Sequence, residues 1–460
     1  MHALGRYVML KALSRPLVRV AERWLPSALT FAVILTVVVA LLALTMTSSG
    51  PVEVVRGWGD GLIGLLAFMT QMSLILLLGH MLANTAPVRR LLTAAAGVPR
   101  TGPQAYGFVA LCAAVASLIT WGLGLVVAAL LSIEVARSGK ERGLRLHFPL
   151  LVASGYSGYV VWHMGYSGSG PLAAATPDSF VEEQVGRTVP VTETIFTWWN
   201  ITGAVLAVVV VVWAMAALAP DRDEPVVELP EGAGQERQSQ SDLLDTGGGG
   251  RTPAERLDGG RVVTTVLGVA LLAYLATYYA QEGFALTLDI VNWTFLCLVM
   301  LLVRSPAELA ELVVGAARNV GDILLQFPLY AGILGIMTAT GLITIFADFF
   351  VSISTQETLG LWAFLAGGVI NMFVPSGGGQ FAVQAPIFLE AAARLDVDPG
   401  IVIMGIAYGD QWTNMIQPFW ALPLLAIARL RIRDIMGFTT VTLIVTGAVF
   451  AITIMLPALF

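Results

Sequence analysis

Charge and cysteine are both scarce in this sequence. Lys, Arg, Asp and Glu together make up 12% of the 460 residues, and the two cysteines are Cys112 and Cys297. Both lie in apolar runs, where a thiol usually serves as a small core residue, so we expect no disulfide framework, no metal cluster and no cofactor. A net charge of −6 does not favour binding to nucleic acid. So low a charged fraction also argues against an ordinary soluble domain.

Apolar residues, by contrast, are abundant. They make up 57% of the chain, and the mean hydropathy is +0.79, which is typical of a membrane protein with several spans. We therefore predict an all-α integral membrane protein with about nine transmembrane helices. The nine apolar runs cover residues 28–46, 61–85, 148–175, 196–218, 262–281, 288–303, 321–346, 399–428 and 436–459.

The basic segment at the start of the chain, residues 1–26, is predicted to form an interfacial helix on the cytoplasmic surface. A merely solvated arm fits the same residues. A cleaved signal peptide is less consistent, because the run 28–46 is longer than a normal signal core. The first span is therefore expected to be retained.

Two further apolar stretches, 103–136 and 358–393, are each interrupted near the centre. In the second, an arm of roughly 22 Å is too short for the roughly 30 Å of a bilayer core. Pro375 and three consecutive glycines, Gly377, Gly378 and Gly379, then end the helix. In the first, Thr120, Trp121, Gly122 and Gly124 interrupt the run. Both stretches therefore predict re-entrant hairpins, whose bare amides must face protein or a watery cavity.

The basic residues orient this arrangement. With a cytoplasmic N-terminus and two hairpins that return to their starting side, 22 of the 25 Lys and Arg residues lie in the cytoplasm, all but Arg56, Arg187 and Arg394. The C-terminus is then periplasmic. The cytoplasmic loop 219–261 is rich in Glu, Asp, Ser and Gly and is predicted to be a disordered linker.

The segments on either side of this linker are predicted to be inverted repeats, 27–218 and 262–460. A shift of 254 residues pairs Trp121 with Pro375, Gly124 with Gly378, and Gly155 with Gly409. The predicted hairpins also enter from opposite sides of the membrane. Inverted repeats with broken helices are a transporter architecture that binds substrate between the two halves.

Candidate anion-binding groups lie at the second hairpin tip. The amides of Ser376, Gly377, Gly378, Gly379 and Gln380 open a helix whose N-terminus carries partial positive charge, which suits a carboxylate. A tightly packed turn without a ligand is the alternative.

Candidate ion-coupling residues follow in the sequence. Asp410 lies well inside an apolar segment, where a carboxylate is costly, so it is predicted to bind a coupling cation or proton unless it is a paired structural residue. Asn371, Thr413 and Asn414 carry oxygens that suit a cation, although hydrogen bonds between helices would use them equally well.

The corresponding polar set of the first half includes Ser154, Ser157 and His163. We predict that some of this set line the cavity, although a serine often bonds back to its own helix. His163 fits a satisfied polar residue better than a proton relay. Trp121 and Gly122 are at the first hairpin tip, where Trp121 could stack against a small acyl chain.

One catalytic pattern is also present. Residues 165–168 match the Gly-x-Ser-Gly pattern of intramembrane serine proteases, with Ser167 as nucleophile and His80 as the one plausible base. Four residues rich in Gly and Ser are a weak signal, and we predict that the chain is not an enzyme.

Four stretches resemble the bacterial short-chain fatty acid transporter family. They are NMFVPSGGGQFAVQAP at 371–386, AYGDQWTN at 407–414, GWGDGLIG at 57–64 and FMTQM at 68–72. The resemblance extends over nearly the whole chain outside 219–261. It implies uptake of acetoacetate, butyrate and similar monocarboxylates across the bacterial inner membrane.

The family in turn resembles a broader ion-transporter superfamily, which implies a homodimer and an elevator mechanism. By this resemblance, Pro375 to Gln380 and Tyr408 to Asn414 correspond to the substrate and ion region. Hairpin tips in that superfamily often read Ser-Asn-Thr, which neither tip does here. The coupling ion, Na⁺ or H⁺, therefore stays open.

Together these observations predict a secondary active transporter of short-chain monocarboxylates. The tip amides and Pro375 would hold the carboxylate, Trp121 and Trp412 the acyl chain, and Asp410 the coupling ion. An exporter or antiporter of another small organic anion, or a channel, is the alternative.

Overall fold

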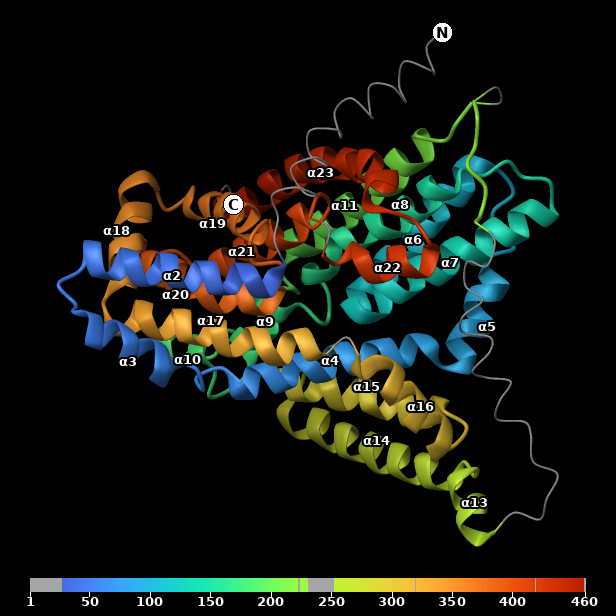
Figure 1. Ribbon diagram of the computed structural model, residues 1–460, viewed down its shortest axis with the longest axis horizontal. Helices are drawn as coiled ribbons and strands as arrows, with labels where there is room; N and C mark the ends of the chain where they lie inside the picture. The colour runs from blue at the N-terminus through green and yellow to red at the C-terminus, as the bar shows by residue number, and fades with distance from the viewer. Residues whose placement is uncertain (1–26, 222–223, 231–251, 319, 418, 459–460) are drawn as a thin grey trace.

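The computed structural model describes residues 27–221, 224–230, 252–318, 320–417 and 419–458, and the regular elements in these ranges are all helices (Figure 1). Eight of the described helices have the length and hydropathy to cross a membrane. The all-α membrane fold is therefore confirmed. The interfacial helix expected in 1–26 lies outside the described residues.

The predicted spans outside the hairpins and broken segments are found as helices. They are α2 (Ala28–Met46), α4 (Leu66–Asn84), α11 (Trp198–Ala217), α14 (Val262–Glu282), α15 (Leu288–Leu302), α17 (Gly321–Ala339) and α23 (Ile432–Met455). Shorter helices connect them: α3 (Pro51–Gly61), α5 (Ala86–Ala95), α10 (Phe180–Val185), α16 (Pro306–Ala317) and α18 (Leu342–Ile353). The run 321–346 divides because Gly341 adopts a positive φ of 72°, which ends α17 and starts α18 in a new direction.

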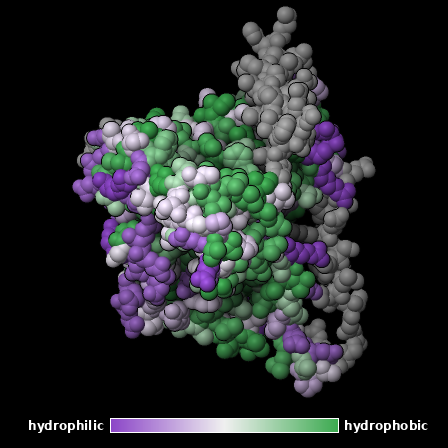
Figure 2. Space-filling view, turned by 60° about the vertical axis from the view of Figure 1, so that its left-hand side comes forward, coloured by the Kyte–Doolittle hydropathy of each residue, from purple (hydrophilic) through white to green (hydrophobic). Residues whose placement is uncertain are grey.

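The outer surface is apolar where lipid would contact it. In α2 and α14 only 17% of the most apolar window is buried, and residues such as Val37, Leu41 and Val266 are exposed. Figure 2 shows hydrophobic residues across the middle of one face, with hydrophilic residues gathered toward its edges. This distribution is the one that a bilayer requires.

The first predicted hairpin is formed by α6 (Gly102–Ile119) and α7 (Trp121–Glu141). Thr120 alone separates them, in an extended conformation with φ −155° and ψ 135°. The chain reverses there. The two arms then pack so closely that a Cβ atom at Gly124 would collide with Ser117 on the other arm. Each arm is as long as a membrane span.

The second hairpin is formed by α19 (Leu359–Asn371) and α20 (Gly377–Leu395). Its arms are antiparallel: the Gln380 side-chain amide donates to the Gly367 carbonyl at 2.8 Å, and four residues further on Gln384 donates to the Ala363 carbonyl, four residues earlier. At 13 residues, α19 is about 20 Å long and too short to span.

The two hairpins enter from opposite ends of the molecule. In Figure 1, α7 reaches the right-hand side, whereas the loop between α18 and α19 lies on the left. The open end of the first hairpin is held by Arg142, whose guanidinium donates to the carbonyls of Pro99, Gly97 and Ala96 beyond α5. The tips therefore point toward each other in the interior.

A broken helix follows each hairpin, as predicted. In the first half, α8 (Phe148–Gly158) continues as the 3₁₀ helix η1 (Tyr159–Met164), and after a break α9 (Ser169–Ala175) begins. In the second half, α21 (Pro399–Thr413) is separated from α22 (Ala421–Ala428). Each broken helix packs on the first arm of its hairpin, and α11 packs on α23. The order hairpin, broken helix, long helix thus occurs twice, while the exact repeat boundaries stay a prediction.

The loop 219–261, predicted to be disordered, contains ordered parts. The Val227 carbonyl accepts the Phe148 amide at 2.8 Å, and the Val227 amide donates to Nδ1 of His147 at 3.0 Å. This pairing satisfies the Phe148 amide at the start of α8, which has no partner within the helix. A capping box at Thr252 and Glu255 starts the short helix α13 (Pro253–Asp258). Residues 231–251 lie outside the described part.

Gly409 tests the contact between α19 and α21. A Cβ atom there would collide with the Phe364 carbonyl oxygen, whereas a Cβ at Gly59, also helical, would meet no atom within 4 Å. Gly409→Ala should therefore destabilise the protein by about 1–3 kcal/mol. Gly59→Ala should leave stability unchanged or raise it slightly. Thermal unfolding in detergent measures both, and equal unfolding temperatures would contradict this contact.

Candidate functional site

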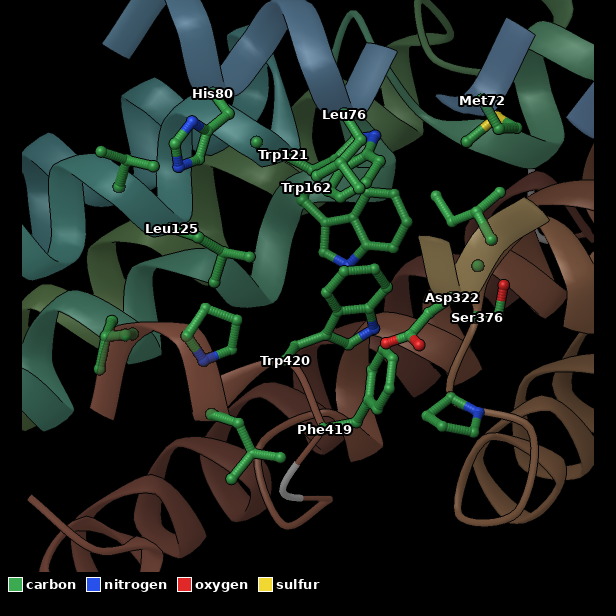
Figure 3. A pocket seen from close by; sticks show the side chains of 18 of the residues that line it. Met72, Leu76, His80, Trp121, Leu125, Trp162, Asp322, Ser376, Phe419 and Trp420 are labelled. Carbon is green, nitrogen blue, oxygen red and sulfur yellow. The ribbon is translucent and has the colours of Figure 1, made fainter. Parts of the chain in front are cut away.

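A cavity of about 440 Å³ lies where the two hairpin tips meet (Figure 3). Trp121 and Gly122 line it from the first tip, and Pro375, Ser376, Gly377 and Gly378 line it from the second. These six were all predicted as substrate-binding residues. The structure thus brings into one wall two segments about 250 residues apart in the sequence.

Most of the cavity wall is apolar and aromatic. Met72 and Leu76 of α4 and Phe327 of α17 form one side. Three tryptophans form another, with the Trp121 ring centroid 5.9 Å from that of Trp162 and 5.2 Å from that of Trp420. Figure 3 shows the three indole rings grouped at the centre of the site. Such a wall suits a short hydrocarbon chain.

The three cavity tryptophans also carry buried hydrogen-bond donors. Within the described residues, the Nε1 atoms of Trp121, Trp162 and Trp420 have no hydrogen-bond partner, nor does the Ser169 hydroxyl, which also lines the cavity. Buried donors are normally paired, and each unpaired one is costly. An acceptor that reached these groups from the cavity would satisfy them.

Backbone donors at the second tip add to this set. Gly377 and Gly378 are the first two residues of α20, so their amides have no acceptor within the helix. Ser376 caps the helix by accepting the Gly379 amide at 3.2 Å. Glycine is required at 377, because a Cβ atom would collide with the Trp162 ring. Bare amides at a helix N-terminus favour an anion at this point.

Charged and titratable side chains also line the cavity. They are His80 of α4, Arg318 just before α17, and Asp322 in its first turn. Arg318 and Asp322 are exposed. The Arg318 guanidinium in the cavity wall attracts small anions, and the Asp322 carboxylate in the same wall weakens this attraction.

Behind the second tip lies a buried carboxylate and imidazole pair. Asp410 Oδ1 is 3.1 Å from His163 Nε2, and both side chains are 1% exposed. The His163 amide also donates to Oε1 of Gln411 at 3.0 Å. The pair joins η1 of the first half to α21 of the second. His163, predicted to be a satisfied polar residue, is the partner of the predicted coupling residue.

The other predicted ion-coupling residues form a cluster beside this pair. The side-chain nitrogen of Asn371 lies 2.8 Å from the Asp410 carbonyl oxygen, 2.9 Å from Thr413 Oγ1 and 2.9 Å from Asn414 Oδ1. Thr413 in turn donates to the Gly368 carbonyl. The oxygens thus converge on an amide nitrogen and hold α19 against α21.

Further side-chain bonds connect the two halves. Tyr156 donates to the Asn414 carbonyl at 2.8 Å, and Thr442 donates to Ser157 Oγ at 2.7 Å. On the other side of α21, Tyr408 donates to Oδ1 of Asn200 at 2.8 Å. The two halves are therefore fastened to each other at several points.

Several predicted substrate-binding residues lie outside the cavity wall. Ser154 donates to the Leu150 carbonyl of its own helix, and Ser157 accepts from Thr442. Gly379 and Gln380 use their donors within the second hairpin. Trp412 points away from the tips, where its indole donates to the Leu443 carbonyl at 2.7 Å. The structure assigns these residues to holding the site together.

Sequence reasoning missed Trp162, Trp420 and Arg318. The two tryptophans lie in or next to the breaks of the broken helices, so the breaks themselves were the available signal. Ser167, weighed as a nucleophile, instead accepts the backbone amide of Trp121 at 3.1 Å. It thereby fixes the first tip to the break of the first half.

The helices and the cavity define a multi-pass membrane protein with a ligand-sized cavity between its hairpin tips. Two solved structures have the same fold, each with a TM-score of 0.58: the YdaH transporter of Alcanivorax borkumensis and MtrF of Neisseria gonorrhoeae, described with a class of antimetabolite efflux pumps. Their identities are 14% and 15%, and the matches cover 94% and 96% of this chain and 98% and 97% of theirs. At such identity the likeness shows the fold alone.

Sequence comparison gives the family. The family model described as short chain fatty acid transporter matches residues 9–457. Proteins named as short-chain fatty acid transporters in Escherichia coli (strain K12) and Haemophilus influenzae (strain ATCC 51907 / DSM 11121 / KW20 / Rd) are 40% and 35% identical. Each match covers 96% of this chain and 99% of the relative. The chain belongs to the short-chain fatty acid transporter family and is a transporter, not an enzyme.

Tryptophan fluorescence tests which indoles face the cavity. The chain has 11 tryptophans, and a small carboxylate such as butyrate should change the emission of the three in the wall. Trp162→Phe and Trp420→Phe should each reduce this change and weaken binding, because an indole donor is lost. Trp412→Phe is the matched control and should retain the change. If only Trp412→Phe abolished the change in emission, the binding site would lie elsewhere.

Proposed function

We propose that this protein is a secondary active transporter that takes up short-chain monocarboxylates, such as butyrate and acetoacetate, across a bacterial inner membrane. The observation that carries the proposal is the cavity in which both hairpin tips meet. Its volume of about 440 Å³ lies near the small end of ligand pockets, which suits a compact solute. Its wall pairs apolar surface with a few convergent donors, the two needs of a short fatty acid.

In the proposed binding mode, the carboxylate lies at the second tip. The amides of Gly377 and Gly378 and the nearby indole N–H groups donate to its oxygens, where the helix dipole favours negative charge. The acyl chain then packs against Met72, Leu76 and Phe327. Trp121 contributes both a ring face and a donor, whereas the role first predicted for Trp412 passes to Trp162 and Trp420.

Transport in this proposal is an elevator movement coupled to a cation. The hairpins and broken helices form the part that moves, and a homodimeric scaffold forms the part that stays. The cation, Na⁺ or H⁺, is bound near Asp410, with Asn371, Thr413 and Asn414 beside it. The N-terminus is cytoplasmic and the C-terminus periplasmic. The opposed hairpins support this proposal, because a site between two such tips can be exposed to either side in turn.

Proteoliposome uptake of labelled butyrate tests the proposal. Undissociated butyric acid crosses bilayers unaided, so protein-free liposomes must be measured in parallel and subtracted. The protein should add a saturable flux that unlabelled acetoacetate inhibits. Efflux or exchange without net uptake would favour the exporter or antiporter instead, and a non-saturable flux would favour a channel.

Ser376 provides a charge test at the tip. Ser376→Asp and Ser376→Asn both keep a side chain that caps a helix, but only Asp adds a negative charge beside the amides. Ser376→Asp should therefore weaken butyrate binding at least about tenfold by repulsion. Ser376→Asn should bind within a few-fold of the parent. Equal binding by the two variants would remove the carboxylate from this tip.

A further inference from the structure

We propose that the coupling cation is a proton held by the Asp410 and His163 pair, and that His163 transmits its charge to the substrate site through the second hairpin tip. This inference rests on the proposed function and specifies the coupling site within it.

The pair is built to take up one proton. With a neutral imidazole and an ionised carboxylate it carries one net negative charge, and both side chains are 1% exposed. Burying an uncompensated charge is costly, and one added proton removes it, whether it resides on the imidazole or on the carboxyl. Among the described residues, Asp410 Oδ2 and His163 Nδ1 have no hydrogen-bond partner. A proton, with a short-chain carboxylate, gives an electroneutral load.

The neighbouring oxygens are less suited to sodium. The Asp410 carbonyl, Thr413 and Asn414 oxygens converge on the side-chain nitrogen of Asn371, each within 2.9 Å. A cation at that point would have to displace an amide that makes three contacts. Asp410 Oδ1 already faces the His163 ring. An imidazolium beside the carboxylate would also repel a second cation.

His163 is next to the substrate site. A Cβ atom at Gly377 would lie 2.7 Å from His163 Nε2, so the tip backbone packs directly on the imidazole. The Trp162 ring, which lines the cavity, stacks on His163 with centroids 3.5 Å apart. A carboxylate bound at the Gly377 amide favours a positive imidazolium behind it. By reciprocity, the protonated pair favours the carboxylate.

Other titratable groups lie on the elements packed against the pair. Tyr156 and Tyr159 lie close enough for the Asp410 charge to affect them. Tyr408 is on the same helix as Asp410 and is bonded to Asn200. The remaining titratable or charged side chains on the helices packed against the pair are Tyr106, Cys112, Glu134, Arg137, Lys140, Glu141, Glu390, Arg394, Arg433 and Asp434.

Proton uptake during binding is the direct test. Butyrate is titrated into the detergent-purified full chain in sodium-free buffers of different ionisation enthalpy, at roughly pH 6 to 9 where an imidazole can titrate. The calorimetric heats give the protons taken up per butyrate bound. We expect uptake to approach one proton as the pH rises. Where the free protein lacks this proton, the apparent dissociation constant should rise about tenfold per pH unit.

Variants assign the proton to the pair. Asp410→Asn resembles the protonated carboxyl, so it should bind butyrate and exchange it across proteoliposomes, with no proton uptake and no accumulation driven by a pH gradient. His163→Gln should lose proton uptake near neutral pH. The matched control is His147→Gln, far from the pair at the start of α8, which should behave as the parent does.

The outcomes separate this inference from the proposed function. Butyrate binding without proton uptake, strengthened by Na⁺, would overturn the proton pair and leave the transporter proposal intact. Proton uptake that persists in both Asp410→Asn and His163→Gln would also overturn it. Failure of the parent protein to bind or exchange any short-chain carboxylate would instead remove the proposed function. The parent titration alone decides the proton question if a variant fails to fold.

Discussion

The constraint behind this structure is that a polypeptide cannot leave its amides unpaired in an apolar environment. Where a helix is interrupted, protein groups outside the helix therefore accept hydrogen bonds from amides that have lost their helical acceptor. At the first tip, Ser167 accepts the amide of Trp121; at the second, Ser376 accepts that of Gly379. The amides of Gly377 and Gly378 face a cavity. The site exists because the chain breaks where protein can surround the break.

Much of this arrangement could be predicted from the sequence. Pro375 and the glycines that follow it interrupt the apolar run, so the second hairpin and its bare amides could be predicted from local chemistry. A carboxylate in an apolar segment marks its own position as unusual, and Asp410 indeed lies at the junction of the two halves. The apolar runs were likewise sufficient to place most of the long helices, although the run 321–346 divides into two.

What could not be predicted is the direction in which individual side chains point once the chain has folded. His163 is 247 residues from Asp410, and nothing local indicates that the two face each other. Trp412 and Trp420 are eight positions apart in one interrupted segment, yet one donates to Leu443 and the other lines the cavity. The break between α21 and α22 changes the direction of the chain, and the composition of the segment does not reveal the new direction. The ordered part of the linker before residue 231 depends on partners outside it, among them the start of α8, Lys140 and Arg145, which the linker's own polar composition does not reveal.

The bonds that tie Tyr156, His163 and Ser157 to the second half make the two tips and the two breaks a single block. The opposite flank of the cavity belongs to α4 and α17, and glycines lie along the seam between block and flank. Gly79 of α4 touches Thr120 and Gly122, while Gly378 touches Phe68 and Phe327. In the proposed elevator movement, a displacement that keeps these hydrogen bonds would occur along this seam, where glycines let the two parts approach closely. The block would then carry its bound substrate without losing the bonds that hold the block together.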